Sequence, residues 1–133
     1  MGMTKTSLWR LREALESCAT CPGVIGTVLA SPEGLVLSAT GALEGDIPAA
    51  MAASIRNGTS SALAELTPSP AREVMVWQDD GLWFLTTVAD NHVLLLGSTD
   101  TRHPGLLRAT ARRAAKQHLA AAGHQLHLWA RRE

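Results

Sequence analysis

Two short pairs of side chains that could bind a metal or do redox chemistry stand out. Cys18 and Cys21 are separated by two residues, and His124 and His127 repeat that spacing about a hundred residues later. Two thiolates and two imidazoles would suit a tetrahedral zinc ion. The histidine spacing is shorter than that of a compact zinc finger, however. We therefore favour buried thiols and surface imidazoles, and we predict neither a metal nor a cofactor.

Redox chemistry is a second possibility for the cysteine pair. A thiol at the start of a helix has a lowered pKa, because the positive end of the helix dipole stabilises the thiolate. Cys18 and Cys21 instead follow an apolar helical pattern and precede Pro22-Gly23, so they end a helix. A metal-dependent or redox enzyme built on these cysteines and the two histidines is therefore only an alternative hypothesis.

Motifs of other catalytic classes do not occur in the sequence. There is no Gly-x-x-x-x-Gly-Lys-Ser/Thr phosphate loop and no Gly-x-Ser-x-Gly nucleophile elbow. Several acidic residues fall in expected turns, where polar side chains are common for conformational reasons. They are Glu33, Asp79, Asp80 and Asp90. We therefore predict a protein that is not an enzyme.

Length and composition predict one folded domain over residues 1–133, with a core over about residues 8–122. The chain has 133 residues, of which 46% are hydrophobic and 18% are charged. Such a composition is too apolar for a disordered chain and, without a long uncharged run, too interrupted for a membrane protein. Residues 1–12 lack the apolar run of a secretory signal, which leads us to expect a cytoplasmic location without membrane insertion.

Charge is balanced in total but unevenly distributed. The sequence has 12 Lys and Arg against 12 Asp and Glu, yet residues 102–133 hold seven of the basic residues and only one acidic residue. Residues 123–133 form a basic, histidine-containing tail. Four basic residues share a helical pattern that could dock an acidic partner, unless it is simply a solvated face. They are Arg108, Arg112, Arg113 and Lys116. The neutral total and the scarcity of aromatic residues predict no nucleic-acid partner. Binding of nucleic acid through these four basic residues, with a steeply salt-dependent affinity, is an alternative hypothesis.

Apolar periodicity predicts three helices and five strands. The helices are expected over residues 7–19, 46–66 and 104–122, and the strands over residues 24–30, 35–39, 73–78, 82–88 and 92–97. Short turns make the first two strands an antiparallel hairpin and the last three an antiparallel meander. The later strands are apolar on both alternating faces, so helices must cover both sides of the sheet.

The second helix carries two different stripes. Asp46 is a plausible N-cap, with Pro48 in the first turn. The expected core stripe is Ala52, Ile55, Thr59, Ala62 or Leu63, and Leu66. A separate stripe is small enough to let another helix approach closely, and it consists of Ala50, Ser54, Gly58 and Ser61. A glycine inside a helix costs about 1 kcal/mol relative to alanine, which favours a packing role for Gly58 over simple solvent exposure.

The order of elements and two short motifs carry a resemblance to a known family. Residues 21–30 read CPGVIGTVLA, and residues 32–38 read PEGLVLS. This pattern resembles the roadblock/dynein light chain family, whose members open with Pro-Gly-Val before the first strand and turn into the second through an acidic-Gly-Leu step. The resemblance extends over about residues 8–122. Residues 80–85 and 91–96 are similar to the fourth and fifth strands of the family.

The resemblance implies a fold and a mode of assembly. The fold is an α/β (α+β) three-layer α/β/α sandwich on a five-stranded antiparallel sheet. Members form dimers in which the sheets join through their third strands and the second helices lie together. The resemblance therefore implies a homodimer in which Val74 and Val76 lie on the joined strand, while Ala50, Ser54, Gly58 and Ser61 face the helix of the partner.

The resemblance also implies a non-catalytic function. Members bind and regulate small Ras-like GTPases, or act as adaptors and scaffolds. We therefore expect a dimeric module that binds and regulates a small Ras-like GTPase. The alternative is a scaffold subunit of a signalling or motility complex that leaves GTP turnover unchanged. Either the paired second helices or the basic last helix could dock the GTPase.

Overall fold

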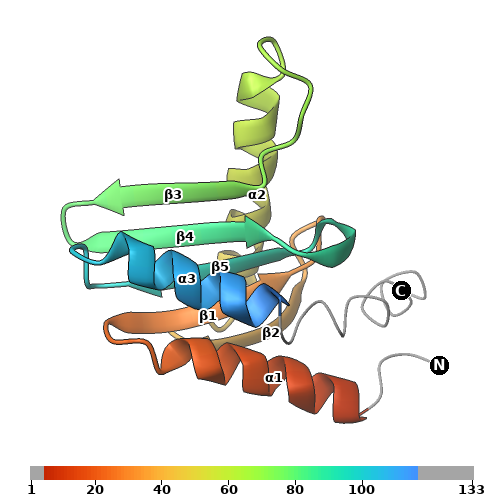
Figure 1. The fold of residues 1–133 in the computed structure, drawn as a ribbon. Coiled ribbons are helices and arrows are strands. Elements are labelled where there is room, and N and C mark those ends of the chain that lie inside the picture. Colours follow the sequence, from red (N-terminus) through yellow and green to blue (C-terminus); the bar gives the residue numbers. More distant parts are fainter. Residues whose placement is uncertain (1–4, 117–133) are drawn as a thin grey trace.

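The computed structural model describes residues 5–116 (Figure 1). The elements follow the predicted order. The helices are α1 (Lys5–Ala19), α2 (Asp46–Leu63) and α3 (Pro104–Ala114), and a short 3-10 helix, η1 (Ala89–Asn91), lies between the last two strands. The strands are β1 (Val24–Ala30), β2 (Val36–Gly41), β3 (Glu73–Gln78), β4 (Gly81–Thr87) and β5 (Val93–Ser98). The last part of the helix predicted over residues 104–122 and the whole of the basic tail lie outside the described residues.

The five strands form one antiparallel sheet in the order β2-β1-β5-β4-β3. The hairpin of β1 and β2 and the meander of β3, β4 and β5 are as predicted. The two halves join because β1 pairs with β5, with Val28 opposite Leu95. This order leaves β2 and β3 at the two edges of the sheet.

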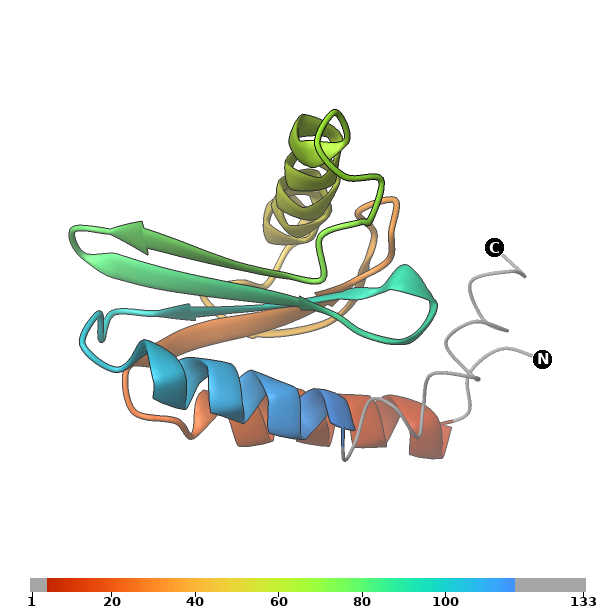
Figure 2. The same cartoon turned by 45° about the horizontal axis from the view of Figure 1, so that its top comes forward.

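Helices cover both faces of this sheet, which confirms the predicted three-layer sandwich. Figures 1 and 2 show α1 and α3 side by side on one face and α2 alone on the other. β5 runs through the centre and faces both layers, since Leu94 and Leu96 point to the α1 and α3 side while Val93 and Leu95 point to the α2 side. This position explains why its sequence is apolar without alternation.

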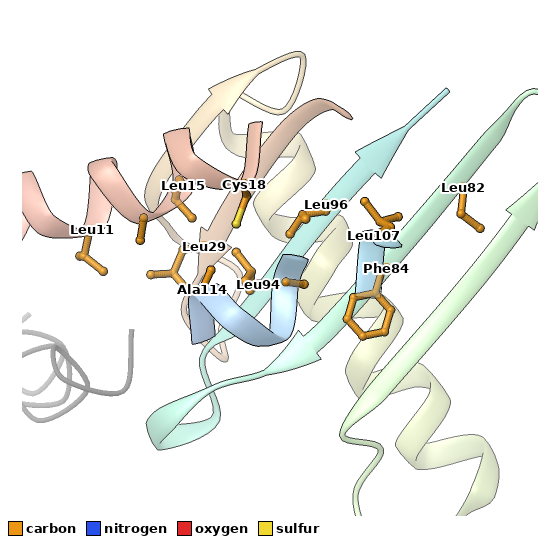
Figure 3. Packing of buried hydrophobic residues seen from close by; sticks show 12 residues of the cluster. Leu11, Leu15, Cys18, Leu29, Leu82, Phe84, Leu94, Leu96, Leu107 and Ala114 are labelled. Carbon is orange, nitrogen blue, oxygen red and sulfur yellow. The ribbon is translucent and has the colours of Figure 1, made fainter. Parts of the chain in front are cut away.

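Each layer has its own apolar core. Residues from α1, α3 and the sheet interdigitate in the larger core (Figure 3); they include Leu11, Leu15, Cys18, Phe84, Leu94, Leu96 and Leu107. The core beneath α2 is built from smaller residues, including Val28, Ala49, Ala52 and Leu95. Full burial of each leucine or phenylalanine contributes roughly 1.5–3 kcal/mol. The alanines of α2 let this helix lie close to the sheet.

The predicted core stripe of α2 is wrong in its second half. Ala52 is fully buried, but Ala62, Leu63 and Leu66 are exposed, Leu66 by 84%. Figure 1 shows the reason: the later turns of α2 extend beyond the edge of the sheet, so no strand among residues 5–116 lies beneath them. The helix also ends at Leu63 rather than at Leu66.

The start of α2 also differs from the prediction. Gly45, with a φ of 110°, is the N-cap, and Asp46 is the first residue of the helix. No side chain caps the helix at this end. The positive φ explains the difference, because glycine adopts this conformation without the steric penalty that a side chain brings. Asp46 still favours the helix, since its negative charge lies near the positive end of the dipole.

Candidate protein-interaction surface

β3 presents an open edge. It pairs with β4 on one side, and no other strand among residues 5–116 pairs with it. Val74 and Val76 are half-buried and face the α2 layer, while Met75 packs against the core on the other face. Unpaired N–H and C=O groups along an edge strand are a template for pairing with another chain. The strand that was expected to join a second copy is therefore accessible for pairing.

An apolar hollow of about 230 Å³ lies beside this edge, between α2 and the sheet. Its lining is Leu43, Pro48, Met51, Ile55, Val76, Gln78, Trp83 and Leu95. Met51 is 55% exposed, and the nearby Ile47 is 73% exposed. Sequence reasoning missed this hollow, although the four-residue spacing of Met51 and Ile55 was a signal for it. Exposed apolar surface next to an open edge is typical of an interface between proteins.

Trp83 gives the hollow a fixed floor. Its ring lies on the backbone of Gly97, where a Cβ would come within 2.5 Å of Trp83 Cζ3. The indole Nε1 donates a hydrogen bond to Gln78 Oε1 at 2.7 Å. Gln78 is the last residue of β3, so this bond also holds the end of the open strand in place.

The small residues of α2 lie on its exposed side. Ala50, Ser54, Gly58 and Ser61 are all exposed, and a Cβ added at Gly58 would meet no atom within 4 Å among the described residues. The opposite side of the helix forms hydrogen bonds with other parts of the chain. Arg56 Nη2 donates to Asn91 Oδ1 at 3.2 Å. Ser60 Oγ accepts from the Ala71 N–H at 2.9 Å. No contact among residues 5–116 accounts for the glycine.

The four basic residues of the predicted docking stripe are exposed on α3, but on two sides of it. Arg112 and Lys116 line a hollow of about 600 Å³ beside β4. Arg113 lines another hollow, of about 240 Å³, which lies beside the end of α1. Arg108 lines neither of these two. Arg112 and Lys116 therefore share one side of α3, and Arg113 lies toward α1, while docking of a partner on these residues stays a prediction.

Arg112 forms a long-range ion pair that has no signature in the local sequence pattern. Its Nε and Nη2 donate to Glu73 Oε2 and Oε1 at 2.7 Å and 2.5 Å. This hydrogen bonding, aided by the charges of Arg112, Arg108 and Arg72, outweighs partial burial and lowers the pKa of Glu73 below its usual value of 4.5. The pair fixes α3 to the first residue of the open strand.

Cys18 has the character of a buried thiol, whereas Cys21 is half-buried. Cys18 is 1% exposed in the core, and burial, with a smaller contribution from the charge of Cys21, raises its pKa to about 11. A thiol with that pKa is protonated at neutral pH and is a poor nucleophile or metal ligand. Among residues 5–116 no three His, Cys, Asp or Glu side chains converge as a metal site would require. His124 and His127 lie outside the described residues.

None of the helices described between residues 5 and 116 combines the length and the apolar character that a membrane span requires. Comparison with curated protein sequences gave no significant match.

Solved structures of MglB and of another Roadblock/LC7 protein have the same fold. An MglB structure with a tetrameric arrangement has a TM-score of 0.81 and 21% identity, over 94% of this chain and 96% of that one. The gliding protein MglB of Thermus thermophilus has a TM-score of 0.80 and 19% identity, over the same shares. A Roadblock/LC7 domain of Streptomyces avermitilis has a TM-score of 0.70 and 22% identity, over 79% of this chain and 91% of that one. At these identities the likeness establishes the fold.

The family is established by the sequence itself. The model of the Roadblock/LC7 domain matches residues 11–98, well over half of the chain. These residues run from α1 through β5 and include the open strand, the apolar hollow and the whole of α2. The chain therefore belongs to the Roadblock/LC7 family.

Proposed function

We propose that this chain forms a homodimer through β3 and α2, and that the dimer binds and regulates a small Ras-like GTPase. Roadblock/LC7 domains are regulatory and non-enzymatic. The observation that carries the proposal is the open edge of β3, flanked by an apolar hollow on the α2 side and by a helix whose exposed residues are small.

Pairing with a second copy would satisfy each of these features. A two-fold axis brings the same patch of both protomers together, so β3 would pair with its own copy and one ten-stranded sheet would result. The unpaired backbone groups of the edge would then find partners. The exposed apolar side chains around the hollow, notably Met51 and Ile47, would lose contact with water.

The small stripe of α2 would permit the close approach of the second α2. Gly58 and its neighbours Ser54 and Ser61 present little side-chain bulk at the surface. A glycine at a position where a Cβ would meet no described atom within 4 Å is explained if a second helix lies against it. The end of α2 extends past the sheet. The exposed side chains of Leu63 and, just beyond the helix, Leu66 would also gain apolar contacts in such a pair.

The dimer would regulate its GTPase through contact rather than through a catalytic group of its own. Its fold is shared with the gliding protein MglB of Thermus thermophilus, which supports a role in a motility system. The GTPase would dock on the paired α2 helices or on the basic residues of α3. Of the latter, Arg108, Arg113 and Lys116 form no ion pair among the described residues.

The test is GTP hydrolysis by the small Ras-like GTPases of the source organism, measured with and without this protein. A changed rate with at least one GTPase supports the regulatory function. Binding with an unchanged rate would instead support the alternative, a scaffold subunit that recruits the GTPase. Absence of binding to every GTPase tested would contradict both. The same hydrolysis reaction is measured with Gly58→Leu, which places a bulky side chain between the two α2 helices of the proposed dimer. It shows whether a change in the hydrolysis rate requires the dimer.

A further inference from the structure

We propose that the acidic turn Asp79–Asp80 of one protomer docks on a basic cluster at the start of β3 of the second copy, and that these contacts set the register of the joined sheet. We define the basic cluster as Arg72, Arg108 and Arg112. This inference rests on the homodimer proposed above and identifies the charged residues that would align its two β3 strands.

The basic cluster surrounds a single carboxylate. Arg72 immediately precedes Glu73, and Arg112 holds Glu73 with two hydrogen bonds. Arg108 and Arg72 are both close enough to lower the pKa of Glu73 through their charges. Three positive charges therefore act on one carboxylate, and only Arg112 is paired with it, since neither Arg72 nor Arg108 forms an ion pair within residues 5–116. The start of the open strand carries excess positive charge.

The other end of the same strand carries the opposite charge. Asp79 and Asp80 form the turn between β3 and β4. Both are exposed, and among the described residues neither takes part in an ion pair. The six residues of β3 span about 20 Å at the usual rise per residue. That distance exceeds the screening length of about 8 Å in physiological salt, so the two ends do not neutralise each other within one protomer.

A two-fold axis would bring these opposite charges together. Two copies of a strand related by a two-fold axis across the sheet run antiparallel, so the start of one lies beside the end of the other. Directly opposite residues in an antiparallel pair lie on the same face of the sheet. A residue can therefore oppose only a residue an even number of positions away, which limits the registers to steps of two.

Two of these registers bring the charged groups close together. If Met75 lies opposite its own copy, Gln78 falls opposite Arg72, so the acidic turn that follows Gln78 begins beside that arginine. If Val76 lies opposite its own copy, Gln78 falls opposite Val74, and the turn begins beside Glu73 and the Arg112 that holds it. A slip by two residues beyond either register moves the turn by about 7 Å along the strand, away from its nearest approach to the basic cluster. The charges therefore favour the two central registers, which also bury the apolar middle of the strand.

A charge-swap experiment tests this inference on the full chain. In the first variant, Arg72→Glu and Arg108→Glu make the cluster acidic; in the second, Asp79→Arg and Asp80→Arg make the turn basic. Each variant alone would have like charges at both ends of the interface, and we expect its homodimer dissociation constant to rise about tenfold or more. In an equal mixture, both ends become complementary, so the two variants should form a heterodimer in preference to either homodimer.

The measurements are the solution mass by light scattering and co-purification of differently tagged variants at low and high salt. Formation of the heterodimer in the mixture would also show that both variants fold. Arg113→Glu, on the other side of α3, is the matched control and should dimerise like the wild type. Variants that dimerise normally, or a mixture that shows no preference for the heterodimer, would overturn the charge alignment while leaving the homodimer intact. A monomeric wild type would overturn both proposals.

Discussion

Arg112 and Glu73 are 39 positions apart in the sequence, and their side chains join α3 to the first residue of the open edge strand. The guanidinium of Arg112 is about half exposed and the Glu73 carboxylate less so. Two parallel hydrogen bonds fix both side chains in orientation as well as position. The contact ties one end of the helix layer to the part of the sheet that we expect to meet a second copy.

Glu73→Gln tests the strength of this ion pair and its dependence on pH. The pKa of Glu73 is lowered in the folded protein, so the carboxylate stabilises the fold at pH values above the unfolded pKa, and this contribution is lost as the pH falls through the lowered folded value. The pair is partly exposed, so we expect a loss of no more than about 1 kcal/mol in the free energy of unfolding near neutral pH.

Urea unfolding over a pH series checks this prediction, with Arg113→Gln as the control because Arg113 forms no ion pair within the described residues. The difference between wild type and Glu73→Gln should shrink as the pH falls through the lowered pKa. A difference that stays constant from neutral to acidic pH would show that the carboxylate charge does not contribute.

Gly97→Ala tests the floor of the apolar hollow. A Cβ at this position would lie 2.5 Å from Trp83 Cζ3, so the indole ring must shift out of its packed position. Forcing an extra carbon into a packed site costs typically about 1–3 kcal/mol. We expect a lower melting temperature together with altered tryptophan fluorescence. Gly105→Ala is the control, because a Cβ there meets no described atom within 4 Å; equal stability of both variants would refute the packing.

The strands could be predicted from local signals, and β3 shows why. Its apolar and β-branched residues are bounded by Pro70 and by the turn Asp79-Asp80-Gly81, and the observed strand has the predicted bounds, Glu73–Gln78. Each of these signals lies within a few residues of the element that it defines. The two-sided covering of the sheet was likewise predictable, because it depends on which side chains alternate along a strand.

The features that escaped prediction depend on distant parts of the chain. Helical periodicity places Leu66 on the same face as Ala52, but it cannot show that the sheet ends before the last turns of α2. The pairing of Arg112 with Glu73 likewise has no signature in either segment alone. Gly58 could be predicted only in part. Its spacing from Ser54 indicates that both residues lie on one side of α2, and both are exposed in the structure. Their contact with a second copy stays a prediction.

The two cysteines should differ sharply in reactivity. Cys18 is buried and its pKa is raised to about 11, whereas Cys21 is half-buried. Alkylation with iodoacetamide at about pH 8 should therefore modify Cys21 in the folded protein and reach Cys18 only after unfolding. The Cys21→Ser variant isolates the buried thiol, and mass spectrometry counts the labels. Labelling of this variant at the rate of a free thiol would contradict the burial of Cys18.

The central claim is the homodimer through α2 and β3, and the solution mass of the wild type and of Gly58→Leu tests it most directly. A Cβ at Gly58 would meet no described atom within 4 Å, so the variant should fold, which circular dichroism verifies. Light scattering should give about twice the chain mass of 14.1 kDa for the wild type and a fall toward 14.1 kDa for the variant. A wild-type mass of 14.1 kDa, or a variant as dimeric as the wild type, would contradict the account.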